Sequence, residues 1–460
     1  MSRASRFLLV LAAILHLFTL VSWRTSTLNP LFFDAVVTHG RRGWDFYALY
    51  QAGHNVLTGH SVYESDGAKI EMVIPDGTYT PFRYLPLSAY TLGVLLNAIS
   101  PLWAYRLWVA AIEALLLGCV ALTWRVVQDP DRRARATAMW LCFTPFYLEL
   151  YMGQFSFVQG ALLFVMLVTA GRAVSTKNRD PIWSAWGWPR RQEHAPRNDK
   201  FMPVPKAMVS PGVPFDLAWV GSVLWKQNTA LLAPLMVRLK RWRALVWLAL
   251  ALLITAVPYF ALVPGSLRAF TGNFTSEPPW FQFGNLGFRQ FIFDLMWSVG
   301  DVLGVEIPAA FYSGAQMAVA LLFAGLALAL TLLDRRPDPV LHIGLWMSAF
   351  FLVYHHVWEH HYVMLLPVLV VLYVQNRFRW VWVIYVLIAL PTPFFPIDPH
   401  GQVAVLDAMR WTPIRPLWQD LVYHASKALP ALALYIALVW QIVRPLIRDW
   451  RRPLTRAAQA

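Results

Sequence analysis

Asp45 is the residue whose type and surroundings best fit chemistry at a hydroxyl group. It lies in the stretch 43–63, just after the first hydrophobic run, with Tyr47 and Tyr50 following two and five residues later. General-base catalysis needs a carboxylate within hydrogen-bond reach of an acceptor hydroxyl. A simpler interpretation is that Asp45 caps a turn or pairs with one of the two preceding arginines. The aromatic residues around it favour the catalytic interpretation, with Asp45 as a base toward a hydroxyl or a sugar.

Two basic residues stand where a phosphate group could be bound. Arg83 lies beside Tyr84 in the segment 80–87, whose prolines also mark a helix start, and the arginine fork suits phosphate oxygens. Lys226 is flanked by apolar sequence, which is costly at membrane depth unless the charge has a partner. Its ammonium either extends to lipid headgroups or provides the counter-charge for the phosphate of a lipid donor, and the sequence leaves both open.

A histidine-rich segment and a polar turn complete the set of candidate residues. Segment 355–362 contains four histidines and a glutamate beside apolar runs, among them His360 and His361 after Trp358. Adjacent histidines suggest zinc, but the spacing is not His-Glu-x-x-His and no further Cys ligands exist, so a metal is the minority interpretation. No cofactor is expected. Hydrogen bonds to a phosphate or sugar are the preferred role of these histidines. Gln154, between two apolar runs, either only closes a turn or binds sugar hydroxyls.

The composition is that of an integral membrane protein. Of 460 residues, 58% are hydrophobic and 14% are charged, and the mean hydropathy is +0.47. A soluble domain contains about 25% charged residues. The net charge of +14 is attributed to arginines of cytoplasmic loops, which lie near anionic lipid headgroups. No nucleic-acid partner is expected. Cys119 and Cys142 lie in apolar runs and offer neither a disulfide framework nor a metal-ligand spacing.

Hydrophobic runs recur along the whole chain and predict an all-α, polytopic transmembrane bundle of about 12 spans. Several are shorter than the roughly 20 residues that cross a bilayer. Run 85–99 is bounded by prolines, and every basic loop falls on the inner side if this run does not span. It is therefore predicted as a re-entrant or juxtamembrane half-helix, with both termini cytoplasmic. The runs are 7–22, 85–99, 102–124, 137–151, 157–173, 214–227, 228–238, 244–262, 307–333, 340–354, 361–375, 378–395 and 428–447.

This topology predicts one membrane domain, 1–460, with three peripheral parts. The first outer loop, 23–101, holds Asp45 and juxtamembrane helices. Segment 174–213, rich in Trp, Pro and Arg, is expected to be a cytoplasmic loop, and 448–460 a cytoplasmic tail. The polar motifs described above then all fall on the outer side.

The order of these motifs resembles glycosyltransferase family 87, within the GT-C class of polyprenol-phosphate-dependent transferases. The similarity extends over roughly residues 40–375. The motifs that carry it are Trp44-Asp45-Phe46-Tyr47, Gly59-x-x-x-Tyr63, Phe82-x-Tyr84-x-Pro86-Leu87, Gly153-Gln154, Lys226, Gly284-Asn285 and Trp358-x-His360-His361.

The resemblance implies an inverting hexosyltransferase at the outer face of a bacterial plasma membrane. The donor would be a sugar on a polyprenyl phosphate, with mannose as the first candidate. The acceptor would be a lipid or a glycan. Asp45 maps to the family's base, and Trp358, His360 and His361 map near the donor phosphate. The other residues implied in donor or substrate binding are Tyr47, Arg83, Tyr84, Gln154, Lys226, Asn285 and Arg289, of which Arg83, Lys226 and Arg289 are candidates to stabilise the leaving phosphate.

Two other functions would use a similar outer cavity. A transporter or flippase of lipid-linked sugars needs polar residues that continue to the inner side, whereas the embedded polar residues here gather on one side. A ligase or polymerase of surface glycans would instead take an oligosaccharide from a diphosphate lipid, and the sequence separates it poorly from the transferase.

Overall fold

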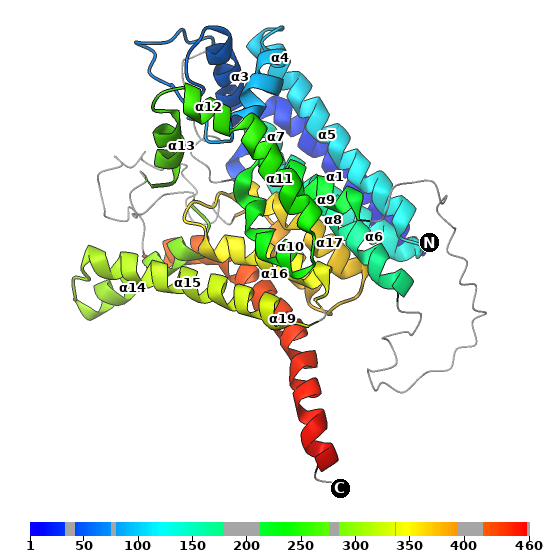
Figure 1. The fold of residues 1–460 in the computed structure, drawn as a ribbon. Coiled ribbons are helices and arrows are strands. Elements are labelled where there is room, and N and C mark those ends of the chain that lie inside the picture. Colours follow the sequence, from blue (N-terminus) through cyan, green and yellow to red (C-terminus); the bar gives the residue numbers. More distant parts are fainter. Residues whose placement is uncertain are drawn as a thin grey trace.

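The computed structural model describes residues 1–32, 42–74, 80–177, 212–275, 285–335, 337–392 and 417–457. These residues form helices and connecting turns without any β-strand, as expected for an all-α protein (Figure 1). The helices are α1 (Arg3–Thr25), η1 (Asn29–Leu31), α3 (Trp44–Leu57), η3 (Ala89–Gly93), α4 (Val94–Leu96), α5 (Pro101–Val126), α6 (Pro130–Leu141), α7 (Pro145–Met152), α8 (Ser156–Lys177), α9 (Val213–Trp225), η5 (Gln227–Leu232), α10 (Ala233–Arg238), α11 (Trp242–Thr255), α12 (Val257–Leu262), α13 (Ser266–Thr275), α14 (Phe288–Leu303), α15 (Ala309–Leu333), α16 (Pro339–Val353), η6 (Glu359–Met364), α17 (Leu366–Val374), α18 (Val381–Ala389) and α19 (Leu417–Ala457).

Five helical segments are long and apolar enough to cross a membrane, as judged by length and composition. They are Arg3–Thr25, Pro101–Val126, Trp242–Leu262, Ala309–Leu333 and Leu421–Ile447. Shorter apolar helices accompany them at Ser156–Ala170, Val213–Trp225, Pro339–Val353 and Glu359–Val374. Apolar helices of this length are typical of an integral membrane protein, while twelve spans stays a prediction.

Several hydrophobic runs are broken rather than continuous. Run 137–151 divides into α6 and α7 at Pro145. At the break, the N–H of Thr144 donates a hydrogen bond to the carbonyl of Ala389. Run 214–238 breaks at Lys226, whose backbone is extended (φ −150°, ψ 114°), so the predicted split at this lysine is confirmed. Run 85–99 is helical only over 87–96, about 15 Å, which is too short to cross a bilayer.

The predicted inner segments meet on one face of the molecule. The N–H of Ser2 donates to Asp131, and the guanidinium of Arg132 donates to the carbonyl of Val374. Arg377 then pairs with Asp338 at 2.6 Å. The basic loops after α5, before α16 and after α17 are therefore neighbours, as the positive-inside rule requires of segments that share one side.

The segment predicted as the first outer loop packs at the opposite end of the bundle, where α3 and α12 lie together in Figure 1. The hydroxyl of Tyr259 on α12 accepts the N–H of Val62 at 2.8 Å. Helix α3 contacts η3 backbone to backbone, because a Cβ added at Gly53 would lie 2.2 Å from the carbonyl carbon of Gly93. This close approach fixes α3, and with it Asp45, against the bundle.

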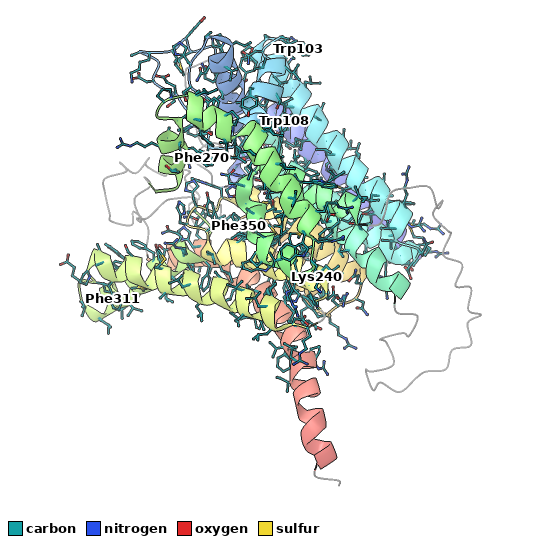
Figure 2. The ribbon with its side chains drawn as sticks, viewed as in Figure 1. Trp103, Trp108, Lys240, Phe270, Phe311 and Phe350 are labelled. Carbon is teal, nitrogen blue, oxygen red and sulfur yellow. The ribbon has the colours of Figure 1, made fainter. Side chains whose placement is uncertain are left out.

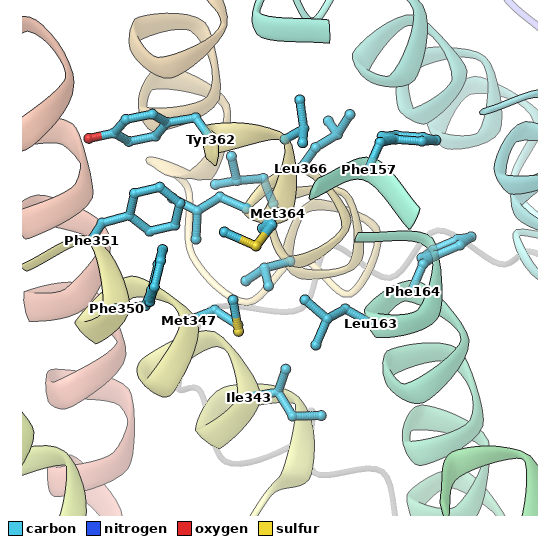
Figure 3. Close-up of a cluster of buried hydrophobic side chains, with 14 of the residues drawn as sticks. Phe157, Leu163, Phe164, Ile343, Met347, Phe350, Phe351, Tyr362, Met364 and Leu366 are labelled. Carbon is cyan, nitrogen blue, oxygen red and sulfur yellow. The ribbon is translucent and has the colours of Figure 1, made fainter. Parts of the chain in front are cut away.

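A buried apolar core holds the histidine-bearing segment in place. Figure 3 shows side chains from α8, α16 and the η6–α17 segment converging on one cluster, with Phe157, Met347 and Met364 among them. The rings of Phe351 and Tyr362 lie 4.4 Å apart between centroids. Core packing of this density leaves η6 little freedom to shift.

The outer surface of the long helices is apolar. Phe7 on α1 is 70% exposed and Ile254 on α11 is 71% exposed, as expected where lipid replaces water. Figure 2 places Trp103, on the first turn of α5, at the end where α3 lies, and Lys240, before α11, far from it. The structure leaves most of the expected loop 174–213, and the segment 393–416, outside the described residues, so the role of that loop stays a prediction.

Candidate functional site

Asp45 lies in the first turn of α3 and is 6% exposed. Thr80 Oγ1 donates to Asp45 Oδ1 at 2.6 Å, and Gln154 Nε2 donates to Asp45 Oδ2 at 2.6 Å. Arg42 instead donates to the hydroxyl of Ser26. The carboxylate is thus held at both oxygens by neutral donors, which fits a group with a fixed orientation better than a surface ion pair.

Glycine makes the approach of Gln154 to Asp45 possible. Gly153 ends α7 in the left-handed conformation (φ 65°), and a Cβ there would lie 2.5 Å from the Cβ of Phe46. The turn between α7 and α8 therefore lies directly against α3. The predicted polar turn is confirmed in position, with Gln154 bonded to Asp45.

The surroundings of Asp45 shift the pKa of its carboxyl in opposite directions. Burial raises the pKa of the Asp45 carboxyl above its ordinary value. The hydrogen bonds from Thr80 and Gln154, and then the positive charges of Lys226 and Arg83, lower it in part. A carboxylate with a raised pKa is a better proton acceptor than an exposed aspartate.

The aromatic residues that follow Asp45 pack against the scaffold. The ring of Tyr47 packs on Tyr105 with centroids 6.0 Å apart, and the hydroxyl of Tyr50 donates to the carbonyl of Ile99 at 2.8 Å. In a helix, residues two and five positions after Asp45 point to other faces. The expectation that Tyr47 binds substrate stays a prediction.

Lys226 and Arg83 are brought to the site by the break after α9. Lys226 is 5% exposed, and its Nζ donates to Ser156 Oγ at 2.7 Å and lies 5.7 Å from the ring centroid of Tyr84. Gln227 Nε2 donates to the carbonyl of Arg83 at 3.2 Å, which ties the two basic residues together. The alternative in which Lys226 extends to headgroups is wrong in this structure, because the lysine is buried within the site.

The histidine pair lies on the first turn of η6. His361 Nδ1 accepts the N–H of Trp358 at 3.0 Å, so the proton of the neutral ring is on Nε2. His360 is 1% exposed, and within the described chain neither of its ring nitrogens has a hydrogen-bond partner. The charge of Lys226 acts on both rings. The indole N–H of Trp358 is bonded to His356.

Asn285 and Arg289 hold the chain that leads to these histidines. Asn285 donates to the carbonyl of His355 at 2.6 Å and accepts the N–H of Val357 at 3.0 Å. Arg289 lies between the carbonyl of Val353 and the side chain of Gln316, both at 3.5 Å. These contacts are with the protein itself, and the expected contact of Asn285 and Arg289 with donor stays a prediction.

Sequence reasoning missed three residues of the site. Thr80 lies in the segment 80–87 and donates to Asp45, and Ser156 accepts a hydrogen bond from Lys226. Glu149 is 0% exposed on α7 and interacts electrostatically with Lys226 and Asp45. Its signal was present, because an acidic residue inside an apolar run is a functional candidate by default.

The site thus combines an oriented carboxylate with two cations and an imidazole pair. Such a set can accept a proton from a hydroxyl and neutralise an anion close by. Comparison of the chain with protein-family models and with curated proteins gives no match to either, so its function is proposed from the residues of this site.

Proposed function

We propose that the protein is a membrane glycosyltransferase that moves a hexose from a polyprenyl phosphate to a hydroxyl of a lipid or glycan acceptor. The observation that carries this proposal is the Asp45 carboxylate, held by Thr80 and Gln154 beside Lys226 and Arg83. The pairing of an oriented base with nearby cations suits transfer from a phosphate leaving group.

In the proposed reaction the acceptor oxygen attacks the anomeric carbon as the bond from that carbon to the phosphate oxygen breaks. Asp45 takes the hydroxyl proton, and the phosphate departs with the electron pair. Attack from the face opposite the leaving group inverts the anomeric centre. No covalent intermediate is needed, because a phosphate is a good leaving group.

Charge that develops on the phosphate is stabilised by the cations and by a neutral donor. Lys226 and Arg83 provide positive charge, and the Nε2 proton of His361 follows from its bond to the main chain. Groups held in place before the reaction need no reorganisation during it. His360, whose ring nitrogens have no hydrogen-bond partner among the described residues, is a further candidate donor.

The proposed placement is a bacterial plasma membrane, in a GT-C-type bundle of about 12 spans with the site at the outer face. Support comes from the basic loops that share one face and from the position of α3 and α12 at the other end (Figure 1). Lipid-linked substrates would reach the site from the bilayer.

A donor screen tests this function. Purified full-length protein in detergent is incubated with polyprenyl-phosphate mannose, other polyprenyl-phosphate hexoses and lipid acceptors, and products are followed by mass spectrometry. The proposal predicts one hexose added to an acceptor and release of polyprenyl phosphate. Movement of labelled lipid-linked sugar across proteoliposomes without product would identify a flippase, and transfer only from diphosphate oligosaccharides would identify a ligase.

A further inference from the structure

Glu149 is a second carboxylate at the site, and the proposed transfer step gives it no task. Its Oε1 accepts the N–H of Phe157, in the first turn of α8, at 2.6 Å. Its Oε2 is buried and has no hydrogen-bond partner among the residues that the structure describes. Capping a helix start requires only one acceptor oxygen, which a glutamine supplies equally well. A fully buried carboxylate is costly without a compensating charge, so the charge of Glu149 needs a partner.

Lys226 is the candidate partner, because its positive charge acts on Glu149. Its Nζ donates to Ser156 Oγ, and Ser156 directly precedes Phe157, so both charged groups are anchored at consecutive residues of α8. Glu149 interacts with Lys226 more strongly than Asp45 does. Because an ammonium has three N–H donors and Ser156 takes one, Lys226 can also bind an anion.

With both carboxyl groups ionised, the charges around Lys226 balance before any substrate arrives. Asp45 and Glu149 contribute two negative charges when ionised, and Lys226 and Arg83 contribute two positive charges. A lipid phosphate adds negative charge to this set. In a site of low polarity, the phosphate and Glu149 must then compete for the same lysine.

We propose that Glu149 is the resting counter-charge of Lys226 and that it competes with the phosphate of the lipid carrier for this lysine. The proposal rests on the transferase function stated above. After transfer the carrier is a phosphate monoester, which carries more negative charge than the donor diester. Competition from Glu149 therefore promotes release of this product, and Glu149 acts as a positioning residue rather than as a catalytic one.

The test measures binding of farnesyl phosphate, a short isoprenyl phosphate, to the full-length protein in detergent at pH 7. Glu149→Gln keeps an oxygen for the N–H of Phe157 but removes the charge. We expect it to bind farnesyl phosphate about five- to tenfold more tightly than wild type. Lys226→Met should bind at least tenfold more weakly, and the double variant should match Lys226→Met. In turnover, Glu149→Gln should show a lower KM for donor and a lower kcat through slower product release.

A purely structural role for Glu149 predicts the opposite sign, because a disturbed site binds less tightly. Equal or weaker binding by a folded Glu149→Gln would overturn the proposal, as would tighter binding that persists in the Lys226→Met background.

Thermal unfolding provides a second test, which does not depend on the transferase function. It also does not require the single variant Glu149→Gln to fold. Lys226→Met leaves the Glu149 carboxylate without its cation, so adding Glu149→Gln to it should raise Tm by a few degrees. No rise, or a fall, would contradict the pairing. Absence of farnesyl phosphate binding by wild type, together with the expected rise in Tm, would count against the proposed donor and not against the pairing.

Discussion

Gln154 donates a hydrogen bond of 2.6 Å to Asp45 across 109 positions of sequence. The bond joins the turn between α7 and α8 to the first turn of α3. Two residues further along the same turn, Ser156 accepts from Lys226. One short segment therefore positions both the proposed base and the proposed phosphate-binding cation.

The two donors to Asp45 should each contribute to catalysis through orientation. Gln154→Leu and Thr80→Val should each lower kcat about 10- to 100-fold, since a misplaced base loses much of its effect. Thr80→Ser retains the hydroxyl and should keep most of the activity. Steady-state transfer assays on folded variants check this. Full activity of both apolar variants would show that these bonds do not serve the reaction.

The raised pKa of Asp45 predicts an acid limb in the pH profile of kcat/KM. The base must be deprotonated, so activity is present above this pKa and is lost as the pH falls through it. Because the direction is upward, the loss begins at higher pH than for an ordinary aspartate.

Thr80→Val should move this acid limb to higher pH, because it removes a hydrogen bond that favours the charged form of Asp45. Thr80→Ser should leave the limb in place. Profiles of kcat/KM from pH 4 to 8 provide the comparison. A limb that stays at the same pH in Thr80→Val would mean that another group controls it.

The sequence predicted those parts of the site that local pattern can reveal. Asp45 stood out because a carboxylate among aromatic residues is unusual, and the helix break at Lys226 followed from polar residues within an apolar run. Each of these two predictions depends on a single short segment of the sequence. The all-α class and the grouping of basic loops also followed from composition and charge, which need no knowledge of packing.

The sequence could not reveal which side chains meet across the bundle. Tyr47, Asn285 and Arg289 contact residues far away in the sequence, and no local pattern predicts these contacts. Glu149 reaches the site only because Pro145 breaks run 137–151 and redirects α7. Such contacts depend on tertiary packing between residues far apart in sequence.

The proposed orientation in the membrane predicts from which side an introduced cysteine can be labelled. In a background with Cys119→Ser and Cys142→Ser, His60→Cys should react with a membrane-impermeant maleimide added outside intact cells. Gln128→Cys, in the exposed loop between α5 and α6, should react only after permeabilisation. Mass-tag shifts on gels report both reactions. The reverse pattern would place the site on the cytoplasmic side.

The buried pair of Lys427 and Glu359 should stabilise the histidine-bearing segment. Lys427 Nζ lies 3.1 Å from Glu359 Oε1 and donates to the carbonyl of Ile388 at 2.7 Å. Lys427→Met should cost about 3–5 kcal/mol of unfolding free energy, since it leaves a buried carboxylate unpaired.

Lys69→Met is the matched control for this prediction, because Lys69 pairs with Asp66 on the surface. It should change stability by less than about 1 kcal/mol. Unfolding of both variants in detergent, followed by circular dichroism, makes the comparison. Equal small effects would show that the buried pair is not needed to hold η6.

The most direct test of the proposed function is hexose transfer by Asp45→Asn. Asparagine has nearly the same shape but cannot accept the acceptor proton, so the folded variant should bind donor and lose at least about a thousandfold in kcat. Asp66 is an exposed residue of the predicted outer loop that also contains Asp45. The Asp66→Asn variant should therefore transfer at the wild-type rate. Transfer by Asp45→Asn within tenfold of wild type would contradict the assignment of Asp45 as the base.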